Sequence, residues 1–111
     1  MSENASLVYV TAPDGETALK LAKTMVERRL AACANILGPI TSVYWWQDKL
    51  NTEGEVALVL KTTENLVGPL TRALRDIHPY ECPCVVAVPI QAGNPDFLAW
   101  IAAETKPAST P

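Results

Sequence analysis

The spacing of hydrophobic and polar positions changes several times along the chain, and each change marks a predicted element. Apolar residues three and four positions apart predict one buried face of a helix that ends at about Ala31, and of a second helix over residues 65–78. Asn94 and Pro95 are typical of the start of a short last helix. Runs of β-branched and aromatic residues predict strands over residues 6–11, 32–46, 55–62 and 82–90.

Turn and cap residues support these boundaries. Asp14 precedes the first helix in a Pro-Asp-Gly turn, where its carboxylate can accept hydrogen bonds from the first helical turn. Pro79 ends the second helix, because a residue before proline avoids helical backbone angles. Gly38-Pro39 interrupts the long second strand and, since proline has no amide hydrogen to donate, indicates an edge strand or a bulge. The polar residues 47–54 are predicted to form the turn before the third strand.

The order of elements is strand, helix, strand, strand, helix, strand and helix. It predicts an α+β, ferredoxin-like βαββαβ fold, in which an antiparallel sheet has its helices on one face and a short helix follows at the C-terminal end. The second and third strands form a hairpin longer than the usual strand of about five or six residues, and such a hairpin tends to pair with a partner. We expect one domain over residues 1–111, with an ordered core at about 6–104 and a flexible tail at 105–111.

The composition indicates which partners and which cellular location to expect for this domain. Hydrophobic residues make up 49% of the chain and charged residues 19%, below the usual charged share of about 25%, which favours a surface partly covered by another subunit. The formal charge is −3, whereas a nucleic-acid binder would show a basic stripe. The sequence contains no run of about 18 apolar residues, the length needed to span a membrane, and the first residues lack a signal-peptide pattern. We therefore expect a cytoplasmic protein without nucleic-acid or membrane partners, whose three cysteines are free thiols.

Five motifs, taken together, give the chain a family resemblance. They are T-A-P-D-G-E-T-A at residues 11–18, R-L-A-A-C-A-N-I at 29–36, S-V-Y-W-W at 42–46, L-K-T-T at 60–63 and H-P-Y-E-C-P at 78–83. In this order and spacing, over about residues 8–104, the chain resembles the CutA family, the divalent-cation tolerance proteins. The resemblance implies a ferredoxin-like subunit in a tight homotrimer whose long hairpins wrap neighbouring subunits. It also implies a link to tolerance of divalent cations, copper in particular.

The sequence departs from the family pattern at positions that bear on metal binding. Val10 and Ile77 stand where some members carry a cysteine and a histidine, so a copper site built on those two positions is not available to this chain. Conversely, Cys84 stands where an acidic residue is usual. Asp48 replaces the usual glycine after the W-W motif.

The densest group of candidate metal ligands is H-P-Y-E-C-P-C at residues 78–84. On a strand, Cys82 and Cys84 would point to the same face and could hold one soft ion such as copper(I); otherwise they are two small, partly buried hydrophobic side chains. His78 is a ligand, a hydrogen-bonding residue that organises a neighbouring cleft, or a residue satisfied by the last helix carbonyls. The candidate ligands are thus His78, Cys82, Cys84 and Cys33. For Cys33 the alternative interpretation is a small buried thiol that binds no metal. We expect no required cofactor, and copper or another divalent cation as the bound ion.

Lys61 lies in an otherwise apolar strand and therefore needs an anionic partner. This partner is either a bound anion or a carboxylate such as Glu81 across a subunit interface. We accordingly predict an intersubunit cleft formed by Lys61, Tyr80 and Glu81.

Three aromatic residues, Tyr44, Trp45 and Trp46, lie together on the predicted hairpin. Clustered aromatic residues are typical of an interface core, and we place these three at the trimer interface; the other interpretation is a platform on which a ligand stacks.

Two functions fit this sequence. The first is a homotrimer that takes part in tolerance of, or response to, divalent metal ions, copper in particular, by direct metal binding. The alternative is a small-molecule-sensing or scaffolding trimer with ligand sites in the clefts between subunits. The sequence contains no nucleophile elbow, metalloprotease helix, P-loop or dinucleotide fingerprint, and we therefore expect no enzymatic activity.

Overall fold

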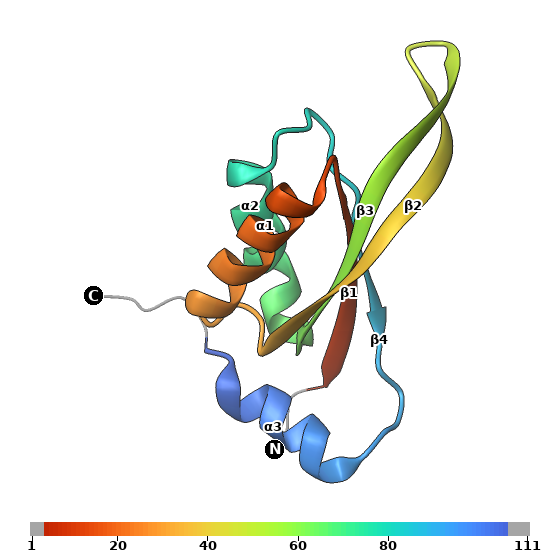
Figure 1. Cartoon of the computed structure of the whole chain (residues 1–111). Helices are drawn as coiled ribbons and strands as arrows, with labels where there is room; N and C mark the ends of the chain where they lie inside the picture. Colours follow the sequence, from red (N-terminus) through yellow and green to blue (C-terminus); the bar gives the residue numbers. More distant parts are fainter. Residues whose placement is uncertain (1–3, 107–111) are drawn as a thin grey trace.

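The computed structural model describes residues 4–106 of the chain. The elements follow in the order β1 (Ala5–Ala12), α1 (Gly15–Glu27), β2 (Cys33–Trp46), β3 (Lys49–Thr63), η1 (Glu64–Leu66), α2 (Val67–Ile77), β4 (Val85–Pro89) and α3 (Pro95–Glu104), where η1 is a single 3-10 turn. The strands form one sheet in the order β2-β3-β1-β4, and every neighbouring pair is antiparallel. Figure 1 shows α1 and α2 on one face of this sheet and α3 at its end. The predicted α+β, ferredoxin-like fold is confirmed.

The hydrophobic core lies between the sheet and the two helices on its face. Alternation along β1 and β3 directs every second side chain toward the helices. The fully buried residues that meet there are Val8, Val10, Leu58 and Leu60 from the sheet, Leu21 and Met25 from α1, and Leu70 and Leu74 from α2. The intervening residues of the same strands point to the opposite face, which neither α1 nor α2 covers (Figure 1).

The helix starts follow the predicted caps. The Asp14 carboxylate accepts a hydrogen bond of 2.7 Å from the Thr17 amide at the start of α1. The Asn94 side chain accepts one of 3.1 Å from the Asp96 amide at the start of α3.

The first helix ends earlier than predicted, at Glu27 rather than at about Ala31. Arg29 takes a left-handed backbone angle, φ 61°, which ends the helix as a C-terminal cap residue usually does. The Leu30 and Ala31 amides then both donate back to the Met25 carbonyl, and Leu30 enters the core at 4% exposure. The left-handed turn therefore redirects the chain toward the core before β2 begins.

The hairpin of β2 and β3 projects beyond the rest of the domain (Figure 1). Its turn consists of only Gln47 and Asp48, with φ of 52° and 63°, between the paired residues Trp46 and Lys49, as in a two-residue hairpin. The predicted turn at residues 47–54 is therefore wrong for residues 49–54, which continue the strand. Because the projecting hairpin is exposed, polar side chains are compatible with strand pairing there.

The predicted interruption of the second strand is a bulge in an edge strand. The pairing register of β2 with β3 shifts between Ile36 and Gly38, and Gly38 has a φ of 109°, a value that side chains other than glycine rarely adopt. β2 lies at the edge of the sheet, where a proline without an amide hydrogen is tolerated.

The fourth strand begins at Val85, three residues later than predicted. Its pairing with β1 runs from Val10 opposite Val85 to Ser6 opposite Pro89, so the partner strand sets where β4 starts. The segment Cys82-Pro83-Cys84 belongs to the loop before the strand. The expectation that strand geometry directs both thiols to one face is therefore wrong.

The C-terminal end of the described chain is attached to the end of α1. Arg29 Nη1 lies 2.7 Å from Glu104 Oε1, and the Lys106 amide donates to the Arg29 carbonyl at 2.9 Å. Thr105 is buried, and its hydroxyl donates to the Ile101 carbonyl at 2.9 Å. The first two residues of the predicted tail are thus held by hydrogen bonds, and residues 107–111 lie outside the described residues. Among residues 4–106, no helix is long and apolar enough to cross a membrane.

Candidate functional site

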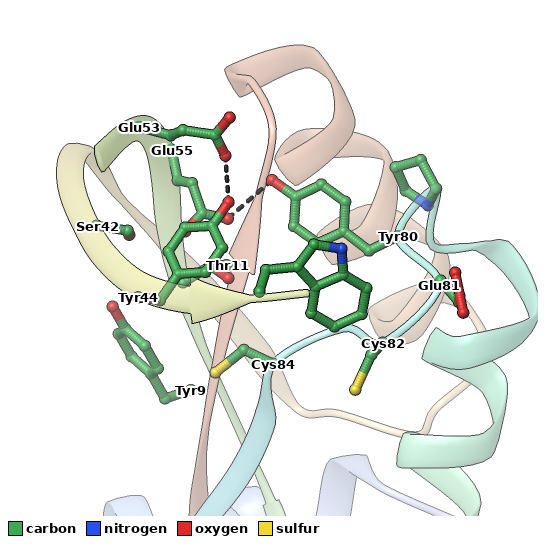
Figure 2. Close-up of a pocket in the computed structure, with 12 residues that line it drawn as sticks. Tyr9, Thr11, Ser42, Tyr44, Glu53, Glu55, Tyr80, Glu81, Cys82 and Cys84 are labelled. Atoms are coloured by element: carbon green, nitrogen blue, oxygen red, sulfur yellow. Dashed lines mark hydrogen bonds between the residues drawn. The ribbon is translucent and has the colours of Figure 1, made fainter. Parts of the chain in front are cut away.

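The sheet face opposite α1 and α2 carries a cavity of about 630 Å³, between the hairpin and the loop that follows α2 (Figure 2). Residues two apart on a strand share a face, and the sheet lines the cavity with such residues. They are Tyr9 and Thr11 from β1, Ser42, Tyr44 and Trp46 from β2, and Glu53 and Glu55 from β3. The loop after α2 adds Pro79, Tyr80, Glu81, Cys82 and Cys84. The cavity therefore has a rigid wall from the sheet and a second wall from the H-P-Y-E-C-P-C segment.

Two pairs of tyrosine and glutamate form one end of the cavity (Figure 2). The Tyr80 hydroxyl donates to Glu55 Oε2 at 2.8 Å, and the Tyr44 hydroxyl donates to Glu53. Partial burial, and then the hydrogen bond to Glu55, raise the pKa of Tyr80 well above its usual range. The hydrogen bond to Glu53 raises the pKa of Tyr44. Both hydroxyls therefore stay protonated and act as donors that fix the positions of the carboxylates.

His78 holds the loop against the sheet. Its side chain is 8% exposed. Its Nε2 lies 2.8 Å from the Thr11 carbonyl oxygen, and its Nδ1 accepts a hydrogen bond of 3.1 Å from the Tyr80 amide. This network assigns the proton to Nε2 and leaves no nitrogen of the ring without a partner. Of the three interpretations drawn from the sequence, the geometry favours a residue that organises the cleft, and its carbonyl partner belongs to β1 rather than to the end of α2.

The two cysteines of the loop lie apart from the third. Cys82 and Cys84 are exposed and line the cavity. Cys33 is half-buried and lines a separate groove between α1 and β2. Within residues 4–106, no group of three or more His, Cys, Asp or Glu side chains could hold a metal ion. Of the four predicted ligands, only Cys82 and Cys84 line this cavity.

The Cys84 thiol differs in its electrostatics from an ordinary exposed cysteine. Neighbouring atoms that cover part of the Cys84 thiol, and secondarily the Glu55 carboxylate, raise the pKa of Cys84. In Figure 2 the side chains of Cys82 and Cys84 leave the loop in different directions, and both sulfur atoms lie away from the Tyr80 hydroxyl. A soft ion bound there would displace the Cys84 proton, because the thiolate is the form that binds metal.

The predicted cleft of Lys61, Tyr80 and Glu81 does not form within one chain. Tyr80 and Glu81 line the cavity, but Lys61 follows Glu55 by six residues along β3, which is roughly 20 Å at about 3.3 Å per residue. The Lys61 ammonium instead donates to Asn35 Oδ1 at 2.6 Å and lies 5.8 Å from the centre of the Phe97 ring. Only a neighbouring subunit could bring a lysine of this kind to Tyr80 and Glu81.

The predicted aromatic cluster is divided between two faces of the hairpin. Tyr44 and Trp46 line the cavity, whereas Trp45 is 72% exposed and does not. Sequence reasoning also missed Glu53 as a cavity residue, because it placed residues 47–54 in a turn. The spacing of two positions between Glu53 and Glu55 was the available signal, since a continued strand places both carboxylates on one face.

Comparison with known proteins identifies the family. Residues 6–104 match the family model described as CutA1 divalent ion tolerance protein. Mouse Protein CutA is 41% identical over 106 residues, which cover 96% of this chain and 60% of the mouse protein, so the chain spans about three fifths of that relative. The crystal structure of CutA1 from Oryza sativa has a TM-score of 0.91 and 40% identity, and the match covers 95% of this chain and 96% of the rice chain.

A structure from Archaeoglobus fulgidus, described as the periplasmic divalent cation tolerance protein CutA, has a TM-score of 0.88 and 36% identity, and the match covers 92% of this chain and 99% of that one. Family match, sequence identity and fold agree over nearly the whole chain. The chain belongs to the CutA1 divalent ion tolerance protein family.

Proposed function

We propose that this chain acts as a homotrimer in tolerance of divalent metal ions, copper in particular, and that it does so by binding a soft metal ion through Cys82 and Cys84 rather than by catalysis. One observation carries the proposal: in a chain of the divalent ion tolerance family, two exposed thiols two residues apart line the same cavity. Thiolates are the ligands that copper(I), the reduced form of the ion, prefers in proteins. The two thiols are therefore suitable ligands for a soft metal ion that the protein carries.

The loop that carries the thiols is well suited to keep them in place. His78 ties its beginning to β1 through the Thr11 carbonyl, and Val85, paired with Val10, ties its end to the same strand. The two thiols thus lie between two fixed points on β1. A preorganised pair loses less conformational freedom on binding than a pair in a free loop.

The trimer is supported by the apolar surface that the hairpin leaves exposed. Trp45 is 72% exposed, Val43 64% and Leu50 62%. Clusters of large apolar side chains exposed to water usually mark an interaction site. A neighbouring subunit that covers the hairpin would bury them. We also propose a cytoplasmic location, because free thiols are typical of reducing compartments.

Copper(I) titration against a chromogenic chelator, under anaerobic and reducing conditions, tests the metal proposal. We expect one copper(I) per chain, and we expect Cys82→Ser/Cys84→Ser to weaken the affinity at least tenfold. Cys33→Ser is the matched control, because it removes a thiol outside the cavity, and it should bind as the native chain does. Equal affinity in the native chain and the double variant would refute the metal site, and a sedimentation coefficient of a monomer at micromolar concentration would refute the trimer.

A further inference from the structure

The cavity is much larger than a pair of thiols with one ion requires. Its volume is about 630 Å³, whereas a water molecule takes about 30 Å³, and sites for small molecules usually range over about 300–1,000 Å³. A metal ion at Cys82 and Cys84 would leave most of this space open. The cavity therefore has room for an organic ligand of several heavy atoms.

Aromatic rings form much of its wall. Tyr9, Tyr44, Trp46 and Tyr80 all line the cavity. The faces of tyrosine and tryptophan rings attract cations, because their π-electrons give the face a partial negative charge. The rings of Tyr44 and Tyr80 are held by the hydrogen bonds of their hydroxyls to Glu53 and Glu55, so a ligand would meet rings that are already in position.

The charges of the cavity are all of one sign. Three lining residues, Glu53, Glu55 and Glu81, are carboxylates, and no Lys, Arg or His among the described residues lines the cavity. In Figure 2, Glu53 and Glu55 lie together and Glu81 lies on the opposite side of the labelled group. Like charges around a partly enclosed space favour a counter-ion of opposite sign, and the phenol hydroxyls that donate to Glu53 and Glu55 do not neutralise them.

We propose that this cavity binds a small organic cation, with one or more ammonium or guanidinium groups, between the aromatic rings and the carboxylates of the hairpin. A metal ion suits the end of the cavity at Glu53 and Glu55 less well, because each carboxylate already accepts a hydrogen bond from a tyrosine hydroxyl. Residues 4–106 also gather no group of three or more metal-binding side chains. The organic cation and the soft metal ion would occupy different parts of the cavity, and this inference does not depend on metal binding at the thiols.

A lysine side chain from a second copy of the chain is the competing source of a positive charge in the cavity. Lys61 lies roughly 20 Å from Glu55 along β3, and its ammonium already contacts Asn35 in its own chain. If a neighbouring subunit placed its Lys61 in the cavity, a free cation would be excluded. The experiment must therefore separate these two occupants.

Isothermal titration calorimetry with spermidine, at constant ionic strength and with an uncharged glycol of similar length as control, tests the inference. We expect saturable binding of spermidine at one site per chain and none of the glycol. Glu55→Gln keeps an acceptor for Tyr80 and removes one charge, and it should weaken binding at least tenfold, about 1.4 kcal/mol. Glu64→Gln is the matched control, since Glu64 is exposed, lies outside the cavity and loses the same charge. It should change the affinity less than twofold.

A second variant keeps the test decisive if Glu55→Gln folds poorly. Trp46→Ala removes an aromatic wall from the exposed end of the hairpin, away from the core, and should also weaken spermidine binding. Equal loss in Glu55→Gln and Glu64→Gln, or no saturable binding of spermidine at constant ionic strength, would overturn the inference. Binding that appears only in Lys61→Met would overturn it as well, because it would show that a second copy supplies the cation. Copper(I) titration of Glu55→Gln reports separately on the thiol site.

Discussion

Replacement of His78 by alanine tests the claim that this residue fastens the site to the sheet. The substitution removes two hydrogen bonds, one from Nε2 to the Thr11 carbonyl at 2.8 Å and one from the Tyr80 amide to Nδ1 at 3.1 Å. Thr11 is 7% exposed, and a buried carbonyl that loses its donor costs about 1–3 kcal/mol. The amide of the half-buried Tyr80 can bind water instead, so the loss of its hydrogen bond to Nδ1 costs about 0.5–1.5 kcal/mol.

The free energy of unfolding should therefore fall by about 1.5–4.5 kcal/mol in His78→Ala. Guanidinium denaturation followed by circular dichroism, at one chain concentration for all variants, measures it. His78→Gln can place an amide nitrogen near the position of Nε2 and donate to Thr11 again, so it should recover about half of the loss. Arg75→Ala is the control, because Arg75 is exposed in the last turn of the same helix, and it should change the free energy of unfolding by less than about 0.5 kcal/mol.

Two results would refute this reasoning. A loss below about 1 kcal/mol in His78→Ala would show that the hydrogen bonds to β1 and the loop contribute little. A His78→Gln variant as unstable as His78→Ala would show that the Thr11 carbonyl does not need the donor at Nε2.

Three further predictions address the hairpin, the first helix and the assembly. Gly38→Ala should lose about 1 kcal/mol in guanidinium denaturation through backbone strain alone, because φ is 109° and an added Cβ meets nothing within 4 Å; Gly54→Ala has the same space without the positive φ, and an equal loss there would contradict the strain. The hydrogen bond from the Thr17 amide lowers the pKa of Asp14 below its usual value of 3.8, so its stabilisation is present above that pH and is lost as the pH falls through the lowered pKa. Asp14→Asn should accordingly flatten the decline of the thermal midpoint below about pH 4, and parallel curves would contradict this. Trp45→Ser should weaken the trimer in sedimentation velocity, whereas Leu19→Ser, on the 50% exposed Leu19 of α1, should not; equal effects would argue against an interface at the hairpin.

The elements that depend on local patterns were predicted well. The alternation in β1 and β3, the spacing of apolar residues in α1 and α2, and the caps at Asp14 and Asn94 each act within a few neighbouring residues. The order of these elements then predicted the ferredoxin-like fold, and the family resemblance implied the same fold.

The errors arose where distant residues decide the structure. β4 begins at Val85 because Val10 of β1 is its partner, and a single sequence does not show which residues pair. α1 ends at Glu27 because Arg29 adopts a left-handed angle, and Arg29 contacts the distant residues Glu104 and Lys106, which a single sequence does not show. Residues 49–54 are polar and look like a turn, but pairing with β2 keeps them in the strand.

The cavity was missed for the same reason. Its wall needs three strands in a fixed register, so that Tyr9, Tyr44 and Glu55 come to one face. The loop residues of the motif, Tyr80 and Cys84, were identified from the sequence, but their partners on β3 could be found only once the strands were aligned.

The most direct test of the metal proposal is a crystal structure of the fully reduced protein soaked with copper, with anomalous scattering measured at the copper edge. We predict a strong peak at bonding distance from the sulfur atoms of both Cys82 and Cys84, and none at His78 or Cys33. No peak at the two thiols, or a peak at His78 with its ring turned away from the Thr11 carbonyl, would contradict the proposed site.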